Sequence, residues 1–184
     1  HFHYFTQFTT YEESYWDAYK AVNRKFAEVV IPHIQPGDMV WVHDYQLLLV
    51  PEMIRQAHPN ISIGFFLHIP FPSYEVFRIL PWREQLLNGI LGADQIGFHT
   101  FGYMRHFLSA AYRITGHEHS VGMLSVNNRA VNVDVFPMGI DYEKYAHTDP
   151  DPQDEEVRKI RDLAKRISLV ISIDRLDYTK GIPT

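Results

Sequence analysis

Ionisable residues directly follow several short apolar runs of this sequence. Asp44 follows "VWVH", His68 follows "GFFL", and Arg175 follows "LVISID", with Lys180 five residues further on. Ligands of open α/β proteins bind beyond the carboxyl ends of the strands, so residues at such positions could meet in one cleft. Arginine offers a planar fork of donors to a phosphate, and lysine adds a mobile positive charge. Arg175 and Lys180 therefore indicate a phosphate-binding site.

The cluster around Arg175 also has a plain structural interpretation. Arg175 could pair with Asp177, and Lys180 with Asp174, in an ordinary group of surface ion pairs. The apolar run Leu169–Ile173 predicts a strand under either interpretation. Both interpretations stay open on this stretch alone.

Asp44 and His68 likewise have two interpretations each. The carboxylate of Asp44 could accept hydrogen bonds from sugar hydroxyls, or it could cap a helix that begins near Tyr45. His68 could place its ring against a ligand, or it could be a core histidine bonded to the backbone. His43 and His99 stand at similar positions after apolar runs. The coincidence of so many ionisable residues at strand ends favours a shared cleft.

Composition excludes several other kinds of site. The 184 residues contain no cysteine, which rules out disulfides, thiolate nucleophiles and cysteine-based zinc sites. The net charge of −5 provides no general attraction for nucleic acid. No apolar run reaches the ~18 residues of a membrane helix, so we expect neither a membrane nor a nucleic-acid partner. His117 and His119 are spaced like ligands on a strand but lack an obvious third ligand, and we expect no metal and no cofactor.

Segments with helical periodicity alternate with short apolar runs along most of the chain. This alternation predicts βαβ units and a mostly parallel, Rossmann-like α/β sheet. The apolar and polar residues on both sides of Asn127 and Asn128 alternate, which predicts a hairpin. The first helix, which begins with a predicted capping box at Thr9 or Thr10, should present one continuous apolar face: Tyr15, Tyr19, Val22, Phe26 and Val29.

The Pro- and Asp-rich stretch after Gly139 predicts a domain boundary. We expect residues 1–139 to form most of one α/β domain, residues 140–153 a linker, and residues 154–184 the start of a second domain. The sequence begins without methionine and stops where a helix should begin, so we expect it to be a piece of a longer protein.

Long motifs of the sequence resemble one enzyme family. "WVHDYQLLLVPEMIR", "IGFFLHIPFPSYEVFRILPWREQLLNGILGADQIGFHT", "FPMGID" and "RLDYTKG" are similar to the trehalose-6-phosphate synthases of glycosyltransferase family 20, and most similar to the long forms that also carry a phosphatase domain. The resemblance implies the GT-B architecture, in which two Rossmann-like domains face each other across a cleft, with only the first largely present here. It also implies cytoplasmic trehalose biosynthesis, in which glucose moves from UDP-glucose to glucose 6-phosphate with retained configuration.

The resemblance also implies roles for the residues at the strand ends. Arg175 and Lys180 would bind the diphosphate of UDP-glucose and stabilise its charge as it leaves. Asp44 would bind glucose 6-phosphate, while His68 and the adjoining Ile69 would line the donor sugar. No metal or other cofactor is implied, because the cations replace it.

Two alternatives and one assembly question stay open. The protein could be a sister enzyme that uses glycerol 3-phosphate as acceptor, or a catalytically silent homologue with a regulatory or assembly role. A homo-oligomer is possible for the full-length protein.

Overall fold

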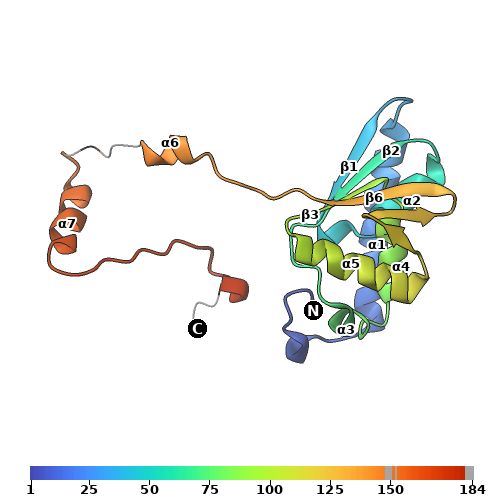
Figure 1. The fold of residues 1–184 in the computed structure, drawn as a ribbon, viewed down its shortest axis with the longest axis horizontal. Coiled ribbons are helices and arrows are strands. Elements are labelled where there is room, and N and C mark those ends of the chain that lie inside the picture. The colour runs from blue at the N-terminus through green and yellow to red at the C-terminus, as the bar shows by residue number, and fades with distance from the viewer. Residues whose placement is uncertain (148–150, 152, 181–184) are drawn as a thin grey trace. The chain divides into compact units, whose positions relative to one another are not determined.

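The chain divides into two compact units, His1–Met138 and Gly139–Thr184. This computed structural model describes residues 1–147, 151 and 153–180. Parts of the predicted linker and of the predicted second domain fall among the other residues, so the domain boundaries drawn from the sequence stay predictions. Figure 1 shows the elements of each unit, which are described separately below.

A six-stranded mixed sheet organises the first unit. Its order is β1 (Met39–His43), β2 (Ser62–Phe66), β3 (Gln95–Phe98), β6 (Arg129–Val135), β5 (Met123–Val126) and β4 (His119–Ser120). The first four of these strands run parallel, whereas β5 pairs antiparallel with β6 on one side and with β4 on the other. The predicted parallel sheet and hairpin are therefore confirmed. Asn127 and Asn128 form the hairpin turn with φ angles of 49° and 63°, which asparagine tolerates better than most residues.

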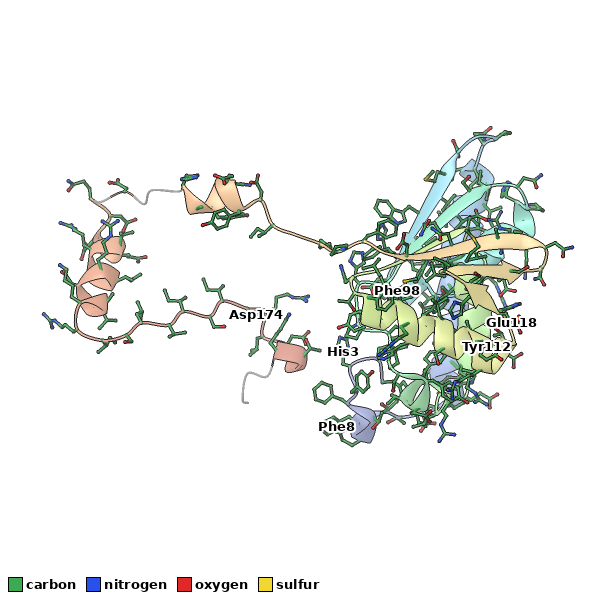
Figure 2. The ribbon with its side chains drawn as sticks, in the orientation of Figure 1. His3, Phe8, Phe98, Tyr112, Glu118 and Asp174 are labelled. Carbon is green, nitrogen blue, oxygen red and sulfur yellow. The ribbon has the colours of Figure 1, made fainter. Side chains whose placement is uncertain are left out.

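Helices cover one face of the sheet. They are α1 (Glu13–Val30), α2 (Val50–Ala57), α3 (Tyr74–Phe77), α4 (Arg83–Leu91) and α5 (Phe101–Thr115). All of them except α1, which precedes β1, connect strands of the sheet. Alternate strand residues such as Val42, Phe65 and Phe98 join the helices in one apolar core. Phe98, labelled in Figure 2, is fully buried. Its ring contacts that of Phe107 on α5, with 5.3 Å between the centroids.

The opposite face of the sheet carries aromatic rings over glycines. On β1, Trp41 lies across from Gly64 in the register and is 65% exposed. A Cβ atom added at Gly64 would lie 3.2 Å from the Trp41 ring, and one at Gly97 would lie 2.6 Å from the Phe66 ring. The glycines therefore let these rings lie close to the backbone of the neighbouring strand.

The predicted apolar face of α1 is wrong for all of its residues except Tyr19, which is partly buried and packs against the core. Tyr15, Val22, Phe26 and Val29 are between 49% and 66% exposed. The buried residues are Trp16, Asn23 and Ala27, each one position later in the sequence. A shift of one residue turns a helix by about 100°, and both faces carry enough apolar residues to fit the periodicity. The predicted capping box is also absent, because Glu12 occupies the cap position and makes no side-chain cap bond.

Two stacked tryptophans fix α1 against the start of α4. The rings of Trp16 and Trp82 are nearly parallel, at 7°, with centroids 5.1 Å apart. Trp16 is almost fully buried, and Trp82 packs against the same core.

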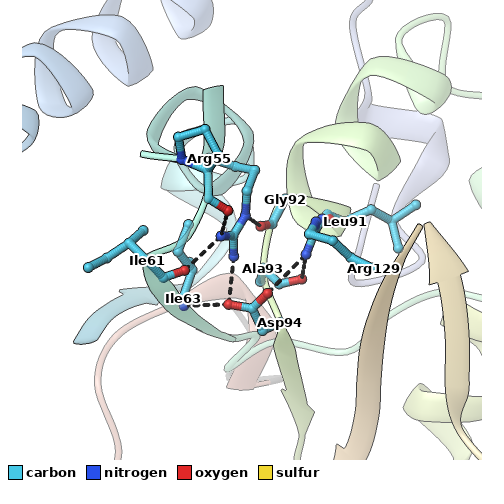
Figure 3. A network of polar contacts seen from close by, with 9 residues as sticks. Arg55, Ile61, Ile63, Leu91, Gly92, Ala93, Asp94 and Arg129 are labelled. Atoms are coloured by element: carbon cyan, nitrogen blue, oxygen red, sulfur yellow. Dashed lines mark hydrogen bonds and ion pairs between the residues drawn. The ribbon is translucent and has the colours of Figure 1, made fainter. Parts of the chain in front are cut away.

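An ion-pair network ties the amino end of β3 to its neighbours (Figure 3). Asp94 accepts from Arg55 Nη2 at 2.6 Å and from Arg129 Nη1 at 3.0 Å. Its Oδ2 also accepts from the backbone N–H of Ile63 at 2.8 Å. Both guanidinium groups also donate to carbonyl oxygens nearby, including that of Gly92. The network joins α2, β2, β3 and β6 at one edge of the sheet.

The second unit contains α6 (Tyr142–Ala146), α7 (Glu155–Ala164) and a 3-10 turn, η4 (Tyr178–Lys180). Asp154 caps α7, as its side chain accepts from the N–H groups of Glu156 and Val157. The predicted strand at Leu169–Ile173 is wrong, because these residues are extended but unpaired and their side chains stand out from the trace (Figure 2). A strand needs a neighbour for its backbone hydrogen bonds, and the described residues of this unit contain no other strand.

Candidate functional site

The carboxyl ends of β1, β2 and β3 bring four of the singled-out residues together. His43 ends β1 and is followed by Asp44, while His68 and His99 follow β2 and β3. The strands are parallel, with His43 paired to Phe66 in the register, so these ends meet at one edge of the sheet. The backbone ladder continues past the strands, since the Asp44 N–H donates to the Phe66 carbonyl at 2.8 Å.

His68 stands at the centre of this edge. Its Nε2 lies 2.9 Å from Nδ1 of His43, and its backbone N–H donates to Oδ1 of Asp44 at 3.2 Å. The rings of His43 and His68 stack with centroids 5.2 Å apart, and the ring of His99 meets that of His68 edge-on at 5.6 Å. His68 itself is exposed, so its interpretation as a core histidine is wrong.

Asp44 adopts an unusual backbone conformation. Its φ of 70° and ψ of 174° are rare for a residue with a side chain, and such conformations cost on the order of 1–3 kcal/mol unless the surroundings enforce them. The carboxylate makes no cap bond to the following 3-10 turn, η3 (Tyr45–Leu47). Its interpretation as a helix cap is therefore wrong, and the carboxylate instead contacts the N–H of His68.

Two side chains of α1 hold the backbone that follows Asp44. The Tyr19 hydroxyl donates to the Tyr45 carbonyl at 2.7 Å and accepts from the Leu48 N–H at 3.0 Å. Asn23 donates to the Gln46 carbonyl at 3.0 Å and accepts from Leu49 N–H at 3.1 Å.

Asn23 is the one buried polar side chain among the described residues. Burial raises the pKa of Tyr19 to about 12, because the ionised phenol would lose its hydration. The polar role of neither residue was predicted from the sequence, in which Tyr19 counted only toward an apolar face; an asparagine inside an apolar helical stretch was the available signal.

The titration of His99 is linked to its neighbours at this edge. Burial lowers the pKa of His99 below its ordinary 6.5, and positive charge on His68 lowers it further. The Asp44 carboxylate and a hydrogen bond to the His68 backbone oppose this shift in the pKa. A proton on His68 therefore makes protonation of His99 less favourable.

A hollow of about 850 Å³ extends over the uncovered face of the sheet and reaches the histidines. Its lining is mostly apolar and includes Trp41, Gly64, Phe66, His43 and His68. Ile69, predicted beside the donor sugar, is half-buried and packs against the core next to His68.

Arg175 and Lys180 lie in the second unit. Lys180 Nζ is 3.6 Å from Oδ1 of Asp174, which is one of the two ion pairs that the surface interpretation requires. The other, between Arg175 and Asp177, is not formed within the part of the chain that the structure describes. Asp177 instead accepts from the N–H and hydroxyl of Thr179 at 2.8 and 2.7 Å. These two bonds, followed by the nearby cations, hold the pKa of Asp177 below its usual range.

The described residues contain neither a metal-binding cluster nor a membrane-spanning helix. They hold no group of three or more His, Asp or Glu side chains placed to bind a metal ion. None of their helices combines the length and apolarity needed to cross a bilayer.

Comparison with known proteins gives consistent relatives. The sequence model of glycosyltransferase family 20 matches residues 1–184. The chain is 46% identical to a bifunctional trehalose-6-phosphate synthase/phosphatase of Thermoproteus tenax, covering 98% of this chain and 25% of that protein. It is also 46% identical to an α,α-trehalose-phosphate synthase [UDP-forming] of Botryotinia fuckeliana, covering 99% of this chain and 36% of that protein.

A solved structure shares the fold. The structure described as trehalose-6-phosphate from E. coli bound with UDP-2-fluoro glucose superposes with a TM-score of 0.88 at 32% identity. The match covers 98% of this chain and 40% of that chain. The chain thus spans between a quarter and two fifths of the length of these relatives.

Proposed function

Because this chain belongs to glycosyltransferase family 20, we propose that it forms part of a UDP-forming α,α-trehalose-phosphate synthase. The observation that carries the proposal is the family match over residues 1–184, together with 46% identity to synthases. The fold agrees, since the sheet of the first unit matches that of a relative bound with UDP-2-fluoro glucose.

The reaction transfers glucose from UDP-glucose to glucose 6-phosphate. The bond between the anomeric carbon and the diphosphate oxygen breaks, and UDP leaves. An acceptor hydroxyl oxygen bonds to the same face of that carbon, and its proton passes to the leaving diphosphate. Stabilising the departing charge is then the main task of the protein, so no side-chain nucleophile is needed.

The residues at the edge of the sheet suit the sugar-binding part of this task. Asp44 would accept hydrogen bonds from glucose 6-phosphate. His68 would line the donor sugar, with Ile69 beside it. The hydrogen bond from the His68 N–H to the Asp44 carboxylate supports a shared role, because it couples the two positions directly.

Arg175 and Lys180 would bind the diphosphate of UDP-glucose. The exposed cluster at residues 174–180 supports this role, since it offers a guanidinium and an ammonium beside a carboxylate that pairs with only one of them, among the described residues. The cytoplasmic location and the homo-oligomer expected from the sequence stay predictions.

We predict that Arg175→Ala lowers kcat/KM for UDP-glucose roughly 30- to 4,000-fold. This factor corresponds to a loss of about 2–5 kcal/mol in transition-state stabilisation. The reason is that truncation leaves the charge of the departing diphosphate without its fork of donors. Arg166→Ala, an exposed arginine nine residues earlier, is the matched control. Steady-state kinetics of the full-length protein test this, and equal values for Arg175→Ala and the control would remove Arg175 from the site.

The test of the whole proposal is UDP release by the full-length protein from UDP-glucose. Glucose 6-phosphate and glycerol 3-phosphate are offered in turn as acceptors. We expect release with glucose 6-phosphate only and trehalose 6-phosphate as product. Release with glycerol 3-phosphate would identify a sister enzyme, and release with neither acceptor would contradict the proposed activity.

A further inference from the structure

The ring of His68 is fixed by contacts from two neighbouring strands. Its Nε2 lies 2.9 Å from Nδ1 of His43, and the aromatic rings of Phe66 and His99 pack against it with centroids at 4.8 and 5.6 Å. His43 is itself held by Trp41, whose ring lies 4.4 Å away on the same strand. These contacts leave the imidazole of His68 little freedom to turn.

The hydrogen bond between the two rings constrains where their protons lie. One of the facing nitrogens must carry the proton and the other must accept it. If Nδ1 of His43 donates, neutral His68 has its own proton on Nδ1. If Nε2 of His68 donates, Nδ1 of His68 is an acceptor. Whether Nδ1 of His43 donates or accepts therefore determines whether Nδ1 of His68 is a donor or an acceptor.

Adding one proton to the pair removes this choice. Three protons then occupy four nitrogens, and the bridge survives only if the vacant nitrogen is one of the facing two. Nδ1 of His68 then carries a proton and acts as a donor, whichever ring holds the charge. Asp44 and His99 are the other titratable groups that face this pair, from β1 and β3.

The Nδ1 atom of His68 is open to a ligand. Within the described residues no side chain or backbone group makes a hydrogen bond to it, and His68 is exposed at the end of the hollow. Nδ1 is thus the nitrogen of the His68 ring that an incoming molecule can reach, and its polarity depends on the hydrogen bond with His43.

We propose that His43 is a positioning residue, which orients the ring of His68 and sets the hydrogen-bonding polarity that its Nδ1 presents to a sugar hydroxyl. The identity of this ligand, the donor sugar, rests on the proposed function. The role of His43 in fixing the ring orientation and the tautomer of His68 does not depend on the proposed function.

The first experiment needs no activity. Long-range 1H–15N correlation spectra of the full-length protein, labelled with 15N-histidine, report which ring nitrogen of His68 carries the proton at mildly alkaline pH. In the wild-type chain we expect one tautomer. In His43→Phe, which keeps a ring beside Trp41 but cannot form the bond, we expect a mixture of tautomers.

Two further variants sharpen this result. His43→Asn places an amide near the position of Nδ1, and we expect it to restore a single tautomer. His119→Asn changes an exposed histidine on β4 and should leave the His68 signals unchanged. Identical His68 spectra in wild type and His43→Phe would overturn the positioning role.

The second experiment tests the ligand in the full-length protein. For His43→Phe we expect kcat/KM for UDP-glucose to fall about 3- to 10-fold, the range for one lost hydrogen bond, with recovery in His43→Asn. If the spectra change while kinetics with UDP-glucose do not, the donor sugar is not the ligand of His68. If neither the wild-type protein nor any variant releases UDP, the proposed function is wrong. The spectra still test the role of His43 in that case.

Discussion

Three imidazole rings stand in one row at the edge of the sheet. His43, His68 and His99 lie at the ends of successive parallel strands, and each adjacent pair of rings is in contact. Burial lowers the pKa of His99, positive charge on His68 lowers this pKa further, and the Asp44 carboxylate opposes the shift. The protonation of His99 therefore depends on its neighbours at this edge.

We predict that His99 makes folding stability depend on pH. Its pKa in the folded chain is lowered, so the unfolded chain binds more protons between that value and 6.5. The contribution of His99 to the free energy of unfolding is fully present above about pH 6.5 and declines as the pH falls below it. Urea unfolding at several pH values should show a flatter profile for His99→Gln. A measured His99 pKa at or above 6.5 in the folded chain would contradict this.

At the level of elements, α1 acts as a support for the loop after β1. Tyr19 and Asn23 satisfy four backbone groups of residues 45–49, directly after the strained Asp44. A backbone at positive φ persists only where its surroundings enforce it. The helix thus determines where the carboxylate of Asp44 points.

We predict that Asn23→Leu lowers the free energy of unfolding by about 2–4 kcal/mol, because the Leu49 N–H and Gln46 carbonyl lose their partner inside the protein. Tyr19→Phe should cost about 1–2 kcal/mol by the same argument. Tyr15→Phe is the matched control, since Tyr15 lies one turn earlier on the same helix and is 66% exposed. Urea titration gives all three values, and equal stability of Tyr19→Phe and Tyr15→Phe would contradict the supporting role.

The sequence predicted those elements that local chemistry determines. The hairpin followed from Asn127 and Asn128, which tolerate positive φ, and the parallel sheet followed from the alternation of apolar runs with helices. The placement of Asp44 and His68 at one edge followed from the same alternation. These inferences need no knowledge of which residues pack together.

Other features depend on tertiary contacts and could not be read from the sequence. Two neighbouring faces of α1, offset by one residue in the sequence, both carry apolar side chains. Periodicity therefore could not predict that Ala27 is buried and Phe26 exposed. The run Leu169–Ile173 has the composition of a strand but has no neighbour to pair with in the described part of its unit. The bond between His43 and His68 required knowledge of the register of β1 and β2.

At the scale of the first unit, the two edges of the parallel strands have different tasks. The amino edge is fixed by Asp94, which joins two arginines and a backbone N–H (Figure 3). The carboxyl edge carries the histidines and Asp44, the residues of the proposed sugar-binding site. The ion-pair network and the proposed site therefore consist of separate sets of residues.

We predict that Asp94→Asn lowers the free energy of unfolding by about 1–3 kcal/mol while the His68 tautomer stays as in wild type. The loss is moderate because the Asp94 side chain is 39% exposed and solvent screens part of the charge. Glu75→Gln breaks an exposed ion pair with Arg78 and should change stability by less than about 0.5 kcal/mol. A change in the His68 spectrum of Asp94→Asn would show that the two edges are not independent.

The stacked pair of Trp16 and Trp82 gives the first unit an optical signature. Two indoles 5.1 Å apart at 7° couple their electronic transitions, and such coupling produces a paired positive and negative band in circular dichroism. Trp41, the third tryptophan of the chain, is 65% exposed and stands apart on the open face of the sheet. Its fluorescence should be quenched by acrylamide, while the paired bands should vanish only when α1 leaves the core. Circular dichroism and fluorescence of one unlabelled sample therefore report on the two faces of the sheet separately.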